Sequence, residues 1–184
     1  MKCKALFLDR DGVINHNHGY VYKQEDFVFV DGIFKLMSCA CRLKYKIIII
    51  TNQAGIGRGY YTPEQFGDLT AWMCDRFSVA GSSIDRVYFS PYHPNAGIGK
   101  YLKDDYSRKP NPGMIMQAQK DFEIRLDTSM LIGDSVSDIQ AGITAGVGTN
   151  LLFSAERSSE LNGIKYDLIS TLFEAIPYLK RGVQ

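Results

Sequence analysis

Three aspartates have the type and spacing that could do chemistry. Asp9 and Asp11 stand two apart directly after a short apolar run, and Asp134 follows another such run much later in the chain. Extended backbone alternates its side chains, so Asp9 and Asp11 can face the same way while Arg10 faces the other. Carboxylates this close repel, and one of them takes up a proton or needs a cation. Acidic oxygens without a histidine or cysteine beside them suit a hard ion, and we expect magnesium.

Two more polar groups stand beside predicted elements. Thr51 and Asn52 follow four consecutive isoleucines, and Arg108 and Lys109 precede a helix start. A hydroxyl, an amide and a lysine charge could together hold a phosphoryl group. Each has a structural alternative: an aspartate or threonine can cap a helix or close a turn, and a single lysine is usually a solvated surface residue. Several such groups at several strand ends argue against that alternative.

The elements that must position these residues alternate along the chain. Apolar, β-branched runs predict strands at residues 5–8, 47–50, 86–90, 130–132 and 148–153. Helical periodicity and caps predict helices at residues 32–44, 62–79, 112–122, 137–145 and 168–179, the last bent or ended near Pro177. This order predicts one α/β domain over residues 1–184, an open parallel sheet in a Rossmann-like three-layer sandwich without a large cap. Its active site should lie at the carboxyl ends of the strands.

Composition limits the possible partners. The chain has 184 residues, 21 basic and 20 acidic side chains, and a net charge of +1, which argues against a nucleic-acid grip built on bulk charge. No secretory signal or long apolar stretch is evident, so we expect a cytoplasmic monomer that does not bind membranes. The four cysteines form no disulfide or zinc pattern and are read as reduced thiols in or near the core: Cys3, Cys39, Cys41 and Cys74.

Taken together, the motifs resemble the four motifs of the haloacid dehalogenase superfamily of phosphatases, in that family's order. They are Asp9-x-Asp11-Gly12, Thr51, Lys109 and Gly133-Asp134-x-x-x-Asp138. A narrower resemblance, covering nearly the whole chain, is to the phosphatases of heptose bisphosphates, with the histidinol-phosphate phosphatase domain as a near relative. It rests on the segments at residues 9–15, 18–20, 51–53, 57–59 and 108–110.

The resemblance implies catalytic roles. Asp9 would attack phosphorus and carry the phosphoryl group, while Asp11 would protonate the leaving alcohol and then take a proton from water. Asp9, the backbone carbonyl of Asp11, and Asp134 would hold magnesium. Thr51 and Lys109 would bind the phosphoryl oxygens in the transition state.

The resemblance also implies a substrate pocket. Arg108 would recognise the sugar or its second phosphate, and Asp138 would support the site from behind rather than bind the metal. The pocket would be lined by His18, Gly19, Tyr20, Asn52 and Gln53. Residues 12–30 would form a short flap, and residues 91–107 a second rim.

The chain departs from the family pattern at a structural zinc site that many relatives carry. The four ligand positions are occupied by residues without soft donors: Ser90, Tyr92, Asp105 and Ser107. We therefore expect the loop without zinc, ordered by packing of Tyr92, Tyr101 and Tyr106. A second departure is Ser135, which stands where close relatives often have lysine.

The expected reaction is hydrolysis of a phosphomonoester through an aspartyl-phosphate, with the 7-phosphate of D-glycero-D-manno-heptose 1,7-bisphosphate as the expected substrate group. This step belongs to the synthesis of nucleotide-heptose for bacterial lipopolysaccharide. The alternatives are histidinol phosphate or another sugar phosphate, and a relative that binds a phosphorylated ligand without turnover.

Overall fold

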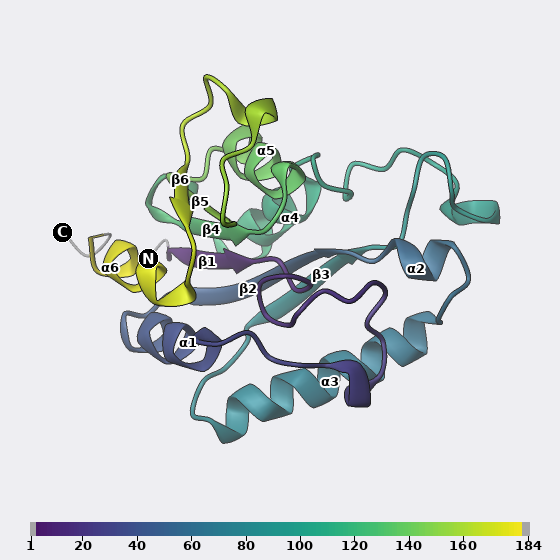
Figure 1. Cartoon of the computed structure of the whole chain (residues 1–184), viewed down its shortest axis with the longest axis horizontal. Coiled ribbons are helices and arrows are strands. Elements are labelled where there is room, and N and C mark those ends of the chain that lie inside the picture. Colours follow the sequence, from purple (N-terminus) through teal and green to yellow (C-terminus); the bar gives the residue numbers. More distant parts are fainter. Residues whose placement is uncertain (1–2, 182–184) are drawn as a thin grey trace.

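The computed structural model describes residues 3–181. Figure 1 shows an open sheet with helices on both sides, built from six parallel strands in the order β3-β2-β1-β4-β5-β6. The strands are β1 (Ala5–Leu8), β2 (Lys46–Asn52), β3 (Arg86–Ser90), β4 (Met130–Gly133), β5 (Thr149–Phe153) and β6 (Asp167–Ile169). The α-helices are α1 (Ile33–Arg42), α2 (Ala54–Gly57), α3 (Pro63–Val79), α4 (Gly113–Phe122), α5 (Val136–Ala145) and α6 (Ile176–Arg181).

The central strands are buried on both faces, because helices cover the sheet on each side. Alternate residues of β1 belong to different hydrophobic cores: Leu6 and Leu8 pack with α1 and α3, whereas Phe7 packs with α4 and α5. The register pairs Leu8 with Ile49 of β2 and with Ile132 of β4. The carboxyl ends of these three strands therefore lie side by side, as the sequence predicts for the candidate site.

The prediction of a last helix at residues 168–179 is wrong over its first part. Residues 168 and 169 belong to β6, which pairs with β5 through Leu152–Leu168 and Phe153–Ile169. A 3-10 turn at Leu172–Ala175 then leads into α6. Pro177 lies in the first turn of α6 and does not end it, because the first turn of a helix needs no backbone N–H there. Pairing with a neighbouring strand therefore overrides the helical pattern of these residues.

The other predicted elements are confirmed with ends shifted by no more than a few residues. Helix α3 follows its predicted cap, with reciprocal hydrogen bonds between Thr62 and Gln65. The short helix α2 was not predicted. All four cysteines are free, and only Cys39 is fully buried. Within residues 3–181, no helix has both the length and the apolar character needed to cross a membrane.

Candidate active site

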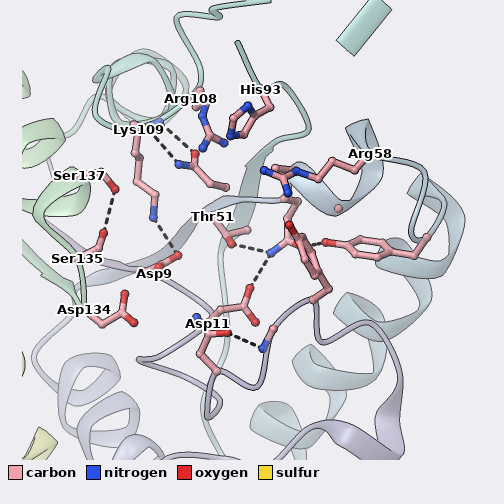
Figure 2. A pocket seen from close by; sticks show the side chains of 18 residues that line it. Asp9, Asp11, Thr51, Arg58, His93, Arg108, Lys109, Asp134, Ser135 and Ser137 are labelled. Carbon is pink, nitrogen blue, oxygen red and sulfur yellow. Dashed lines mark hydrogen bonds and ion pairs between the residues drawn. The ribbon is translucent and has the colours of Figure 1, made fainter. Parts of the chain in front are cut away.

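A cavity of 420 Å³ opens at the carboxyl ends of β1, β2 and β4 (Figure 2). It brings together ten of the residues predicted for the site: Asp9, Asp11, Gly19, Tyr20, Thr51, Asn52, Gln53, Arg108, Lys109 and Asp134. His18 is not among the lining residues, and its exposed ring lies beside that of His16, with 6.2 Å between centroids. Asp138 is fully buried at the start of α5, next to the cavity.

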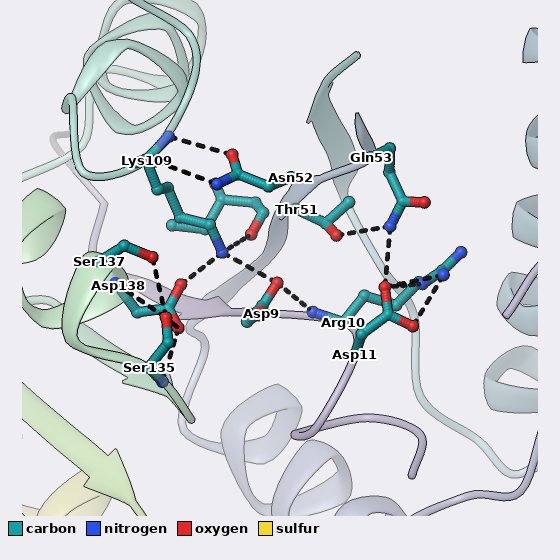
Figure 3. Close-up of polar contacts among 11 residues, drawn as sticks. Asp9, Arg10, Asp11, Thr51, Asn52, Gln53, Lys109, Ser135, Ser137 and Asp138 are labelled. Carbon is teal, nitrogen blue, oxygen red and sulfur yellow. Dashed lines mark hydrogen bonds and ion pairs between the residues drawn. The ribbon is translucent and has the colours of Figure 1, made fainter. Parts of the chain in front are cut away.

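Lys109 is the centre of a buried charge cluster (Figure 3). Its side chain is 3% exposed, and its ammonium lies 2.9 Å from Oδ1 of Asp9 and forms a second ion pair with Asp138. It also donates to the carbonyl oxygen of Ile50 at 2.9 Å. These contacts engage all three hydrogens of the ammonium. The backbone N–H of Arg10 donates to the same oxygen of Asp9 at 2.7 Å, so the Asp9 carboxylate is held from two sides.

The crowding of carboxylates shifts their pKa values. Burial raises the pKa of Asp9 to about 8, with the charges of Asp138, Asp134 and Asp11 adding to the effect and Lys109 opposing it. Burial, followed by Asp138, raises the pKa of Asp134 to about 6. Burial disfavours the charged form of Lys109, but the two carboxylates beside it outweigh that effect and raise its pKa. The single positive charge of Lys109 does not neutralise all of these carboxylates, so the cluster keeps negative charge that a further cation would neutralise.

The geometry of the acidic cluster fits a hard divalent cation. One carboxylate oxygen from each of Asp9, Asp134 and Asp138 lies within 4.8 Å of the others. Both oxygens of Asp138 already have partners, because one pairs with Lys109 and the other accepts the N–H and the hydroxyl of Ser135 at 3.0 and 2.6 Å. Asp9 and Asp134 are therefore the side chains best placed to bind an ion. The carboxylate of Asp11 lies outside the cluster, which leaves its backbone carbonyl as the group implied by the resemblance.

Gly12 lets the backbone approach Asp134. A Cβ atom at this position would lie 1.8 Å from Oδ2 of Asp134, and the residue has a φ of 94°. We expect Gly12→Ala to displace the Asp134 carboxylate and to weaken binding of divalent cations by at least about tenfold, measured by calorimetry. Gly81→Ala is the matched control, because Gly81 also has a positive φ, of 79°, but open space around its Cβ position. Equal affinity in the two variants would contradict this account.

The raised pKa values predict that binding of magnesium is coupled to release of protons. Asp9 and Asp134 have pKa values of about 8 and about 6, and a carboxylate must be ionised to bind a cation. Magnesium affinity should therefore fall as the pH is lowered through this window, by up to about tenfold per pH unit for each proton displaced. Titration calorimetry in buffers of different ionisation enthalpy measures the protons released. A binding constant that does not change between these two pH values would contradict the prediction.

Asp11 is held by donors from three residues. Nη2 of Arg10 donates at 2.8 Å, Nδ2 of Asn15 at 3.0 Å and Nε2 of Gln53 at 2.9 Å. Gln53 also donates to the Thr51 hydroxyl at 2.8 Å, which leaves the hydrogen of that hydroxyl available to a ligand. The hydroxyl of Tyr61 donates to the amide oxygen of Gln53 at 2.5 Å and so fixes the orientation of the amide. Gln53 thus links the predicted acid to the predicted phosphoryl-binding hydroxyl.

Another part of the cavity is a basic wall, formed by Arg58, His93 and Arg108, which faces the acidic cluster described above (Figure 2). Nε of Arg58 is buried and has no hydrogen-bond partner among residues 3–181. Arg108 donates through Nη1 to the carbonyl oxygen of Tyr92 at 3.1 Å. Burial, together with the neighbouring charge of Arg58, lowers the pKa of Arg108, as expected for two guanidinium groups that share one space. Such a wall is suited to a second anionic group.

Several lining residues were not predicted as site residues: Asn17, Ala54, Gly55, Arg58, Tyr61, His93, Ser135 and Ser137. Arg58 belongs to the segment Gly57-Arg58-Gly59, one of those that carry the resemblance, and this was the available signal for it. Ser135, which stands where relatives often have lysine, caps α5 and bonds to Asp138. Here Lys109 supplies the positive charge next to Asp138.

Comparison with known proteins identifies close relatives. A family model described as HAD-hydrolase-like matches residues 106–166. The D-glycero-alpha-D-manno-heptose-1,7-bisphosphate 7-phosphatase of Burkholderia mallei is 52% identical over 179 residues, which cover 97% of this chain and 95% of that protein. The D-glycero-beta-D-manno-heptose-1,7-bisphosphate 7-phosphatase of Vibrio cholerae is 43% identical over 148 residues, 80% of each chain.

A solved structure has the same fold. It is that of a D,D-heptose 1,7-bisphosphate phosphatase from B. bronchiseptica, complexed with magnesium and phosphate. The two chains are 22% identical, superpose with a TM-score of 0.84, and are covered over 97% of this chain and 98% of that one.

Proposed function

We propose that this chain removes the 7-phosphate of D-glycero-D-manno-heptose 1,7-bisphosphate. The chain belongs to the haloacid dehalogenase-like hydrolases and, within them, to the heptose-1,7-bisphosphate 7-phosphatases. It is a phosphatase, and the proposal concerns its substrate, its metal and its covalent intermediate. The observation that carries it is one cavity lined both by the proposed nucleophile Asp9 with Lys109 and by two arginines, Arg58 and Arg108. Such a cavity suits a sugar with a phosphate at each end.

In the first step, a carboxylate oxygen of Asp9 attacks the phosphorus of the 7-phosphate. The bond from phosphorus to the sugar oxygen breaks, and Asp11 gives its proton to that oxygen as the alcohol leaves. The product of this step is an aspartyl-phosphate on Asp9. The hydrogen bond from Gln53 to Asp11 at 2.9 Å holds the acid in place for the transfer.

In the second step, Asp11 takes a proton from water, and the water oxygen attacks the phosphorus. The bond to Asp9 breaks, which releases inorganic phosphate and restores both carboxyl groups. The Lys109 ammonium, 2.9 Å from Asp9, and the Thr51 hydroxyl stabilise the negative charge on the phosphoryl oxygens in both steps.

Asp9, Asp134 and the backbone carbonyl of Asp11 would hold magnesium, which would supply positive charge to neutralise the phosphoryl group and keep the carboxylates ionised. The fit rests on the carboxylate oxygens of Asp9 and Asp134, which come from the ends of β1 and β4 and lie within 4.8 Å of each other.

The basic wall recognises the phosphate at the other end of the sugar. Of the two anomers, the alpha form is the one we propose, because the relative with 52% identity is named for it. The product would then enter the synthesis of nucleotide-heptose for bacterial lipopolysaccharide.

A substrate panel tests this proposal. Phosphate release by the purified chain with magnesium is measured for both anomers of the heptose bisphosphate, for histidinol phosphate and for p-nitrophenyl phosphate. We expect the highest kcat/KM for the alpha anomer. Equal or better turnover of histidinol phosphate would assign the chain to the sibling activity instead. Binding of the bisphosphate without phosphate release would favour a non-catalytic relative.

Arg58→Ala tests the basic wall separately from the chemistry. Loss of a charged hydrogen bond to phosphate costs about 1.5–3 kcal/mol, which corresponds to a decrease of roughly 10- to 100-fold in kcat/KM for the bisphosphate. Turnover of p-nitrophenyl phosphate, which has no second phosphate, should stay within about twofold of wild type. Equal losses on both substrates would show that Arg58 supports the fold and does not recognise the distal phosphate.

A further inference from the structure

The loop at residues 91–107 is fixed to the sheet by a small polar network around Asp105. Oδ1 of Asp105 accepts hydrogen bonds from the Ser107 hydroxyl at 2.6 Å and from the Ser107 N–H at 2.9 Å. The Ser107 hydroxyl is also hydrogen-bonded to the hydroxyl of Ser90 at 3.0 Å, and Ser90 is fully buried at the end of β3. Oδ2 of Asp105 pairs with Lys103 at 2.7 Å. These contacts join the start of the loop to its end.

The residues of this network occupy three of the four positions where the resemblance places zinc ligands in relatives. Serine hydroxyls and a phenol are poor zinc donors, and a single carboxylate does not make a tetrahedral structural site. Ser90 and Ser107 are bonded to each other, and both oxygens of Asp105 have partners. The donor set therefore does not fit zinc, and the hydrogen bonds close the loop in its place. Packing of tyrosines, expected from the sequence, contributes only in part: the rings of Tyr92 and Tyr101 are 6.0 Å apart, but Tyr106 is exposed.

The network leads directly to Arg108. The carbonyl oxygen of Asp105 accepts the N–H of Arg108 at 2.9 Å and the side-chain amide of Asn111 at 3.2 Å. The guanidinium of Arg108 is held from the other side of the loop by the carbonyl of Tyr92. Both halves of the loop must therefore keep their spacing for the guanidinium to face the cavity.

We propose that Asp105 is a positioning residue, which holds the two halves of this loop together and so aims Arg108 at the distal phosphate of the substrate. The hydrogen bond that the Ser107 N–H donates to Asp105 would by itself be an ordinary turn. The hydrogen bond between Ser107 and the buried Ser90 connects that turn to the sheet. This connection is why the turn can position Arg108. The effect on turnover rests on the proposed function, and the effect on the loop does not.

Asp105→Ala tests the proposal with two measurements. We expect KM for the heptose bisphosphate to rise about tenfold, because one charged contact to phosphate is weakened, while kcat and the turnover of p-nitrophenyl phosphate stay within about twofold. We also expect faster hydrogen exchange of the amides in residues 101–111. Asp105→Asn keeps an acceptor oxygen for Ser107, so its KM should stay close to the wild-type value.

Asp127→Ala is the matched control, since Asp127 also pairs with a basic residue, Arg125, at 2.8 Å but precedes β4, at the amino end of that strand and away from the cavity. The proposal is overturned if Asp105→Ala changes neither KM nor exchange relative to this control, if the loop exchanges faster without a change in KM, or if both substrates are affected equally. If the wild-type chain shows no preference for the bisphosphate, the proposed function fails, and the exchange measurement alone decides whether Asp105 holds the loop.

Discussion

Asp9→Asn is expected to abolish phosphate release from every substrate, with kcat lower by at least about 10⁴-fold. Asparagine has nearly the same shape as aspartate but cannot form the acyl-phosphate. It also removes one of the carboxylates nearest to Lys109 and Asp134. The fold should persist, because the substitution relieves repulsion among buried carboxylates rather than creating a cavity. Residual turnover is measured by phosphate release with enzyme in large excess over any trace contaminant.

The matched control for this variant is Asp127→Asn, the same chemical change at an exposed aspartate that precedes β4 at the amino end of the strand. It should have wild-type activity. If Asp9→Asn kept more than about one hundredth of the wild-type kcat while remaining folded, Asp9 would not be the nucleophile.

Lys109→Met is expected to impair both activity and stability. The ammonium is the buried positive charge that pairs with Asp9 and Asp138, and both carboxylates are left unpaired when it is removed. Breaking a buried ion pair in this way costs about 3–5 kcal/mol in the free energy of unfolding. Loss of the positive charge beside the phosphoryl group should also lower kcat by roughly 10²- to 10³-fold. Denaturant unfolding and phosphate release measure the two effects separately.

The double variant Lys109→Met with Asp138→Asn separates the two roles of the lysine. Neutralising Asp138 removes a fully buried charge that has lost its partner, so much of the lost stability should return. Activity should not return, because the phosphoryl group still lacks the ammonium. Recovery of activity together with stability would mean that Lys109 acts only through the fold.

The convergence of the site could be predicted from the sequence, because it depends on topology. Asp9 and Asp134 each follow a strand, and Thr51 lies at the carboxyl end of β2. Parallel strands bring residues at their carboxyl ends together. The structure places all three on one cavity. Strand β6 could not be predicted, because its short apolar run also has a helical pattern and only the pairing with β5 decides between them.

The loop residues of the cavity were less accessible to sequence reasoning. The direction of His18 and the approach of Arg58 depend on loops whose backbone follows no periodic pattern. Arg58 lies just after the short helix α2, which was not predicted, and lines the cavity, whereas the predicted His18 does not. The hydrogen-bond network around Asp105 could not be predicted for another reason. Sequence analysis singled out its residues only because they replace zinc ligands, and the hydrogen bonds among them form only in the folded loop.

The most direct test of the account is to look for the phosphoryl group on Asp9 itself. Enzyme turning over substrate with magnesium is quenched in acid, digested, and analysed by mass spectrometry. We expect the peptide that contains Asp9 to carry the mass of one phosphoryl group, and the same peptide from Asp9→Asn to lack it. A phosphoryl group found on another residue would contradict nucleophilic attack by Asp9. The same conclusion would follow if active enzyme at substrate saturation gave no phosphorylated peptide, while phosphate release stopped in Asp134→Asn but not in Asp9→Asn.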